Sequence, residues 1–280
     1  MGGYQWITGP DLPVMPITPG HPVRRLSQEE FGELSYQVMS HVFDIHNEFG
    51  RFFDERIYKR ELAARCPGVE LEFPVTLSHW TFRTTCYLDA LVGGGGAFEF
   101  KAVERLTSVH QGKLYNYLLL LDLAHGKLVN LRGESVEHEF VNSTLRPEER
   151  YTFEIVADRW SASVKGGDEL REAIVGLLDD WGTGLELGMY EAALVHFLGG
   201  EKQVVREVRV RGQRGVVGTQ TMRLVADGVA FRLTAFESDG GRFEDHARRL
   251  LRHVDLRAIL WVNIGLRRVT FTTIESGAGL

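Results

Sequence analysis

The chain repeats itself, and this internal repeat constrains the fold more than any other feature of its 280 residues. Four pairs of matching residues lie 132 to 136 positions apart: Tyr58 and Tyr190, Phe98 and Phe231, Asn130 and Asn263, and His110 and His246. The last pair is the most widely separated, which we attribute to a short insertion. Because a nearly constant offset is not expected by chance, we predict two copies of one domain, over residues 26–142 and 168–275.

The two remaining segments flank these copies. Residues 1–25 are rich in proline and glycine, which predicts an extended N-terminal arm. Residues 143–167 are largely polar, and we expect them to form a linker between the copies.

Helix and strand patterns follow one another within the first copy. Apolar residues recur at helical spacing over residues 26–50, where Ser27 and Glu30 match a capping box and Gly50 is suited to end the helix. Further helices are expected over 54–65 and 108–126. Strands are expected over 69–77, 80–92, 97–103, 127–131 and 136–142, with four glycines turning the hairpin between the second and third. This order predicts the α/β class, with a small mixed sheet flanked by helices.

The composition is that of an ordinary soluble protein, with 44% apolar and 25% charged residues. No apolar run reaches the roughly 18 residues needed to cross a bilayer, and the N-terminus lacks the pattern of a signal peptide. Cys66 and Cys86 form no metal-ligand pattern, so we expect free thiols in a reducing, cytoplasmic environment.

Charge is distributed unevenly between the two copies. The formal net charge is −6, which by itself does not indicate a nucleic-acid-binding protein. Residues 202–268, however, contain 14 Lys or Arg against 7 Asp or Glu. This asymmetry makes the second copy the basic half of the chain.

The hairpin of the first copy carries charged residues where burial is expected. Glu99 and Lys101 point to the same face because side chains alternate along a strand, and Asp89 on the adjacent strand reaches that face too. Unpaired buried charges cost several kcal/mol, so the three residues need partners. Two interpretations remain open at this point: a salt-bridge cluster at the sheet edge, or a Mg²⁺ or Mn²⁺ site with the carbonyl of Phe100 as a further oxygen ligand. A metal-bound water would be a nucleophile for a phosphodiester.

Several blocks of the first copy resemble a known family. The segments "IHNEFG…DERIYKREL", "YLDALV", "FEFKAVERLTSVH" and "LYNYL" are similar, in order and spacing, to the bacterial GxxExxY proteins of the PD-(D/E)XK nuclease superfamily. The resemblance covers roughly residues 28–142. It implies a restriction-endonuclease-like core and a metal-dependent nuclease that acts on nucleic acid, with DNA as the expected substrate. The implied catalytic residues are Glu55, Asp89, Glu99 and Lys101, with Asp89 and Glu99 as metal ligands.

The resemblance also assigns supporting residues. Tyr58 is the motif tyrosine, and His110 lies in a matching block. Related nucleases often carry Q-x-x-x-Y in the following helix, and here Tyr117 matches the tyrosine while Lys113 stands at the glutamine position. This departure implies either a weakened site or a direct contact of Lys113 with a phosphate.

The second copy lacks the charged residues of the first. The repeat places Met222 opposite Asp89, Arg232 opposite Glu99, Thr234 opposite Lys101 and Leu187 opposite Glu55. This copy is therefore expected to be degenerate. A solvated charged face is the simpler explanation of the arginines in this copy. Arginine also pairs well with phosphate, so Arg232, Arg248, Arg249 and Arg252 are candidates for holding nucleic acid.

Three functional hypotheses follow. The first is a Mg²⁺- or Mn²⁺-dependent nuclease whose arginine-rich second copy holds the substrate. The second is a catalytically inactive module that keeps the fold for binding nucleic acid or protein. The third is a scaffold in which the second copy packs on the first as an internal pseudo-dimer and only stabilises it.

Overall fold

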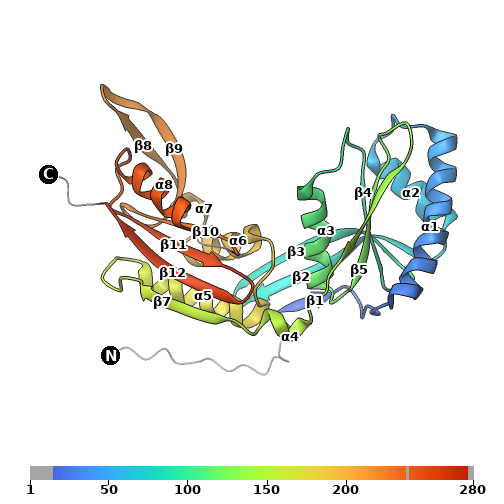
Figure 1. Cartoon of the computed structure of the whole chain (residues 1–280), viewed down its shortest axis with the longest axis horizontal. Helices are drawn as coiled ribbons and strands as arrows, with labels where there is room; N and C mark the ends of the chain where they lie inside the picture. The colour runs from blue at the N-terminus through green and yellow to red at the C-terminus, as the bar shows by residue number, and fades with distance from the viewer. Residues whose placement is uncertain (1–14, 238–239, 277–280) are drawn as a thin grey trace.

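The structure is a computed structural model that describes residues 15–237 and 240–276, so most of the expected N-terminal arm lies outside the described residues. The chain forms two six-stranded mixed sheets, one built from the first half and one from the second (Figure 1). The α/β fold class predicted from the sequence is confirmed. No helix among the described residues is long and apolar enough to span a membrane.

The first sheet has the strand order β1-β2-β3-β4-β5-β6. Only β4 and β5 run parallel, and every other neighbouring pair is antiparallel. Its strands are β1 (Ile17–Pro19), β2 (Val69–His79), β3 (Phe82–Val92), β4 (Gly96–Lys101), β5 (His125–Asn130) and β6 (Glu137–Asn142). Its helices are α1 (Gln28–Phe49), α2 (Glu55–Arg65) and α3 (Ser108–Leu120). The predicted capping box of Ser27 and Glu30 is present at the start of α1.

The second sheet has the order β7-β12-β11-β10-β9-β8. Its strands are β7 (Glu154–Arg159), β8 (Val205–Gly212), β9 (Gly215–Ala226), β10 (Val229–Thr234), β11 (Ala258–Ile264) and β12 (Arg268–Glu275). The accompanying helices are α5 (Gly167–Trp181), α6 (Leu187–Phe197), α7 (Glu201–Val204) and α8 (Gly241–Leu251). Strands β8 to β12 follow the same order as β2 to β6, and the parallel pair β10–β11 corresponds to β4–β5.

The element boundaries change one detail of the expected repeat. Helices α3 and α8 begin at Ser108 and Gly241, which are 133 residues apart, and β4 and β10 begin at Gly96 and Val229, also 133 apart. The connection therefore contains no insertion, and the expected match of His110 with His246 is wrong. His246 corresponds to Lys113 instead.

The same tertiary hydrogen bond recurs in both halves. The Tyr58 hydroxyl donates to the carbonyl of Gly50 at 2.6 Å, and the Tyr190 hydroxyl donates to the carbonyl of Gly182, also at 2.6 Å. Both glycines end the preceding helix with φ near +70°, a conformation that glycine adopts without strain. The bond ties the second helix of each half to the end of the first helix.

A second shared feature is an asparagine that bridges two segments. Asn130 accepts a hydrogen bond from the amide of Val103 and donates one to its carbonyl. Asn263 makes the same two bonds to Phe236. These pairs hold the loop after β4 or β10 against the end of the next strand, so the repeated residues are explained by a common framework.

The segment predicted to be a linker is part of the second sheet. Residues 143–167 contain α4 (Pro147–Arg150) and β7, and β7 pairs in parallel with β12. The linker prediction is wrong because β7 is a short, half-exposed edge strand, and such a strand has no long apolar run that would mark it in the sequence.

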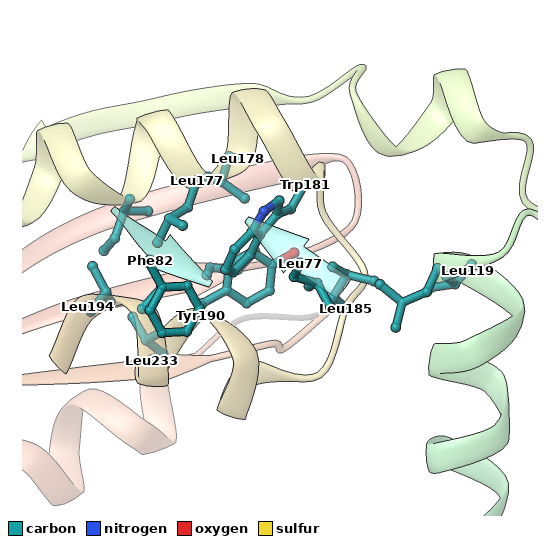
Figure 2. Packing of buried hydrophobic residues seen from close by; sticks show 14 of the residues in the cluster. Leu77, Phe82, Leu119, Leu177, Leu178, Trp181, Leu185, Tyr190, Leu194 and Leu233 are labelled. Carbon is teal, nitrogen blue, oxygen red and sulfur yellow. The ribbon is translucent and has the colours of Figure 1, made fainter. Parts of the chain in front are cut away.

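One hydrophobic cluster spans the two halves, and each half has a further cluster of its own. The hairpin of β2 and β3 reaches across to α5 and α6, where Leu77 and Phe82 pack among residues of the second half (Figures 1 and 2). Trp181 is fully buried there, and its indole N–H donates to the carbonyl of Ser78 at 2.9 Å. The partners from the second half that Figure 2 labels are Leu177, Leu178, Trp181, Leu185, Tyr190, Leu194 and Leu233.

A buried arginine lies at the same junction. The Arg150 guanidinium donates to the carbonyls of Leu119, Trp181 and Thr183. It therefore joins the end of α3 in the first half to the end of α5 in the second. Burial lowers the pKa of Arg150 from its ordinary value. Its bonds satisfy buried carbonyls at the ends of the two helices, which lack intrahelical partners.

Candidate functional site

The candidate site lies where two strands separate. β3 and β4 pair through Val92 with Gly96, Leu91 with Ala97, and Ala90 with Phe98, and they diverge beyond the last pair. The glycine turn holds them together at the other end. Gly93 and Gly94 have positive φ, and a Cβ on Gly96 would lie 2.5 Å from the Leu34 side chain. Asp89 and Glu99 are thus the first residues inside the fork between the strands.

Asp89 is buried and accepts hydrogen bonds from three directions. Its Oδ2 accepts from the backbone N–H of Phe100 at 2.9 Å and from the Lys101 ammonium at 3.4 Å. Its Oδ1 accepts from Lys59 at 3.0 Å. The bond to Phe100 fixes the carboxylate across the fork, from β3 to β4.

Glu99 is completely buried, with an exposed fraction of 0%. Its Oε1 accepts from Lys101 at 2.7 Å and from Lys113 at 2.5 Å. Its Oε2 is buried without a hydrogen-bond partner among the described residues. A buried carboxylate oxygen in this state is costly, because nothing replaces the water it has lost. The fork therefore retains an unsatisfied acceptor.

Lys101 lies between the acidic groups. Besides its bonds to Asp89 and Glu99, its ammonium donates to the carbonyl of Phe100 at 2.5 Å and lies 3.7 Å from a Glu55 oxygen. Oxygens from four residues therefore converge on one positive charge. This is the expected E-x-K pair with its aspartate, assembled on adjacent strands.

The two central carboxyl groups have opposite pKa shifts. Burial raises the pKa of Glu99 and the nearby Asp89 carboxylate adds to the effect, so that Lys101 and Lys113 do not restore its ordinary value. Burial also acts to raise the pKa of Asp89, but Lys101, Lys113 and Lys59 outweigh it and hold that pKa below its ordinary value. Asp89 is thus the more firmly ionised of the pair.

Two residues that the sequence analysis did not select complete the cluster. Lys59 is buried and donates to Asp89 and Glu72, at 3.0 and 2.6 Å, and it lies 3.4 Å from Glu55. A signal for Lys59 was available, because it follows Glu55 by one helical turn. Glu72 had none, since its role depends on a backbone conformation with φ of +52° in the middle of β2.

The supporting residues divide into two groups. Lys113 reaches Glu99 from α3 and so belongs to the cluster. The other three bond to the backbone instead: Tyr58 to Gly50, Tyr117 to the Tyr87 carbonyl at 2.6 Å, and His110 to the amide of Thr107 at the start of α3. These contacts position the elements around the fork rather than contacting its carboxylates.

The fork offers the oxygen ligands that a divalent cation requires. No group of three or more His, Cys, Asp or Glu side chains in the described ranges is arranged to hold a metal. Mg²⁺ and Mn²⁺, however, commonly take only one or two carboxylates together with backbone oxygens and water. Asp89, Glu99 and the Phe100 carbonyl form such a set, and the unpartnered Glu99 oxygen is an acceptor that such an ion would satisfy.

The arginines expected to hold nucleic acid differ in whether a carboxylate already pairs with them. Arg248 is bonded to Glu244 at 2.7 Å, and Arg159 with Arg248 lowers the pKa of Glu244 to about 2. Arg249 lies exposed on α8, and Arg252 follows at its end. Arg232 projects from β10 and is exposed, with no carboxylate within ion-pair distance among the residues described.

Comparison with known proteins agrees with this geometry. Residues 32–142 match the family model of the PD-(D/E)XK nuclease superfamily. The matched range contains β2 to β6, α2, α3, most of α1 and every charged residue of the fork. No curated protein and no solved structure gave a significant match.

Proposed function

We propose that the first half of the chain is a divalent-metal-dependent nuclease that hydrolyses phosphodiester bonds of DNA or RNA. The observation that carries this proposal is the fork between β3 and β4, where Asp89, Glu99 and Lys101 converge and one Glu99 oxygen lacks a partner. The family match over residues 32–142 supports it. We also propose that the first half is related to the GxxExxY proteins of this superfamily, because its sequence blocks resemble theirs in order and spacing.

The metal would be held by Asp89, Glu99 and the carbonyl of Phe100, and the resemblance favours Mg²⁺ or Mn²⁺. Bound there, it would lower the pKa of a coordinated water and stabilise negative charge on the phosphate.

Lys101, Lys113 and Glu55 have separate roles in the proposed reaction. Lys101 holds a proton firmly, since the pKa of its ammonium is raised: burial opposes the charge, but Glu99 and Asp89 outweigh it. A fixed ammonium beside the phosphate offsets the charge that develops during attack. Lys113 is part exposed and is suited to contact a substrate phosphate. Glu55 lies at the edge of the cluster and orients Lys101 and Lys59.

We further propose that the second half is a degenerate copy that arose by tandem duplication. Its strand order, its parallel pair and its two repeated hydrogen-bond patterns match those of the first half. Its role in the proposal is to hold substrate and to stabilise the first copy through the shared core.

The test is a cleavage panel on single- and double-stranded DNA and RNA, with Mg²⁺, with Mn²⁺ and with EDTA. We expect metal-dependent cleavage of at least one substrate and its loss in Glu99→Ala. Glu169→Gln is the matched control, because it removes an exposed carboxylate from α5 of the second half. Cleavage by Glu99→Ala at the wild-type rate would refute the proposal.

A catalytically inactive binding module is the second candidate function. It is favoured by one observation, the bond of Lys113 to Glu99, which places an ammonium where related nucleases carry a glutamine. Calorimetric titration with Mn²⁺ distinguishes the two functions. Heat of binding that disappears in Glu99→Ala supports the nuclease, whereas no heat with either protein supports the module.

A further inference from the structure

The fork of the second half contains a pocket, and the catalytic site proposed for the first half makes no use of it. A cavity of about 500 Å³ opens between β9, β10 and α8. Its lining includes Met222, Arg223, Arg232, Phe243, His246 and Leu250. The volume falls within the range of ordinary small-molecule sites.

The pocket occupies the position of the charged cluster in the first half. The register of β9 and β10 pairs Leu224 with Ala230, as β3 and β4 pair Leu91 with Ala97. Two residues before Leu224 comes Met222, and two after Ala230 comes Arg232. The pocket therefore lies at the same fork, with Met222 at the place of Asp89 and Arg232 at the place of Glu99.

The charge of this fork is reversed. Glu99 is replaced by Arg232. Glu72 is replaced by Arg206, which lies opposite Met222 in the register of β8 and β9 and is ion-paired with Asp227 at 2.8 Å. Lys59 corresponds to Glu191, and that carboxylate is already paired with Arg223 at 3.0 Å. Glu191 does not line the pocket, and the carboxylate that does, Glu201, belongs to the short α7 and is exposed. The fork that attracts cations in the first half therefore attracts anions in the second.

The Arg232 guanidinium is available to a ligand. It has no ion-pair or hydrogen-bond partner among the described residues, and His246 on α8 has none either. Thr234, at the place of Lys101, is engaged elsewhere, because it donates to Asn263 at 2.8 Å and accepts from Trp261 at 2.9 Å. Phe243, Leu250 and Met222 supply an apolar wall beside the cation.

We propose that this pocket binds one phosphate-bearing nucleotide without a metal ion. Arg232 is suited to a phosphate, since its planar fork of N–H donors matches phosphate oxygens in geometry and charge. The apolar wall with the Phe243 ring is suited to a base, which stacks on aromatic side chains. The same chemistry is offered by a free nucleotide and by the terminal nucleotide of a strand.

The experiment titrates the full-length Glu99→Ala variant in EDTA with adenosine monophosphate, adenosine and inorganic phosphate. This background removes the proposed nuclease activity and metal, so a failure here leaves the proposed function intact, and the converse also holds. We expect adenosine monophosphate to bind at least about tenfold more tightly than adenosine, because the phosphate contributes a charged contact. Equal binding of the two, or binding of neither, would overturn the proposal.

Substitutions locate the site. Adding Arg232→Ala should weaken binding of adenosine monophosphate at least about tenfold, and Arg232→Lys should restore part of it. Arg171→Ala should leave it unchanged, because Arg171 lies on α5, which packs on the opposite face of the sheet. Unchanged binding by Arg232→Ala would also overturn the proposal.

Competition distinguishes the two sources of nucleotide. Short single-stranded oligonucleotides with and without a 5′-phosphate are added to the complex with adenosine monophosphate. Displacement that requires the 5′-phosphate identifies a strand end as the ligand. Retention of adenosine monophosphate against both oligonucleotides identifies a free nucleotide.

Discussion

The two forks are built on the same backbone plan and carry opposite chemistry. In the first half, Asp89 and Glu99 are buried among three lysines. In the second, the corresponding positions hold Met222 and Arg232, and a cavity lies between them. Both forks retain the tyrosine bond to the helix-ending glycine and the asparagine bridge. The difference shows that this strand arrangement does not require the acidic residues, so their presence in one half calls for a functional explanation.

The largest expected effect is a loss of cleavage when the fork of the first half is changed. Lys101→Ala should lower the rate of cleavage by about 10²-fold or more, because an ammonium aimed at developing charge contributes on this scale. Circular dichroism and thermal unfolding should show a folded protein. The matched control, Glu169→Gln in the second half, should cleave at the wild-type rate. Cleavage by Lys101→Ala close to the control would remove the functional distinction between the forks.

The next effect tests how the buried cluster is balanced. Lys59→Met should lower the free energy of unfolding by about 3 kcal/mol, since it removes a buried cation that is bonded to both Asp89 and Glu72. Arg60→Met, on the exposed side of the same helix, should change it by less than about 0.5 kcal/mol. Denaturant unfolding measures both variants. Equal free energies of unfolding for the two variants would show that Lys59 is not needed to neutralise the buried carboxylates.

A smaller loss of stability is expected, and it should be of the same size in both halves. Tyr58→Phe and Tyr190→Phe each remove the hydroxyl that bonds to a glycine carbonyl at 2.6 Å, so each should cost about 1–2 kcal/mol. Neither should change cleavage by the folded protein. If Tyr58→Phe alone abolished cleavage while both variants stayed folded, the motif tyrosine would be catalytic and the shared framework would not explain it.

The smallest expected effect is on the pH dependence of stability. Because the pKa of Glu99 is raised in the folded state, the folded protein binds this proton more tightly than the unfolded chain, and stability falls as pH rises from the unfolded value through the folded one. Glu99→Gln should remove this fall, so its stability should improve relative to wild type as pH rises above about 4.5.

Asp89 should behave in the opposite way, which provides the control. Its pKa is lowered in the folded state, so its contribution to stability is present above its unfolded value and is lost as pH falls through the folded one. Asp89→Asn should therefore lower stability most at neutral pH and least in acid. Unfolding measured from pH 3 to pH 8 distinguishes the variants, and parallel curves for both would contradict the opposite shifts.

The sequence determined the repeat and most of the elements, because both depend on local patterns. The capping box at Ser27, the helix end at Gly50 and the hairpin around the four glycines are each specified by neighbouring residues. The placement of Asp89, Glu99 and Lys101 in one cluster also followed, since alternation along two paired strands brings them to one face.

Only the tertiary structure decided how the halves join and what surrounds the carboxylates. Lys59 bonds from α2 to Asp89 on β3 and to Glu72 on β2. β7 joins a sheet through a strand more than a hundred residues away. The unpartnered oxygen of Glu99, the pocket beside Arg232 and the burial of Trp181 against Ser78 depend on contacts between distant segments. Local periodicity carries no information about such contacts, because they form only when packing brings the segments together.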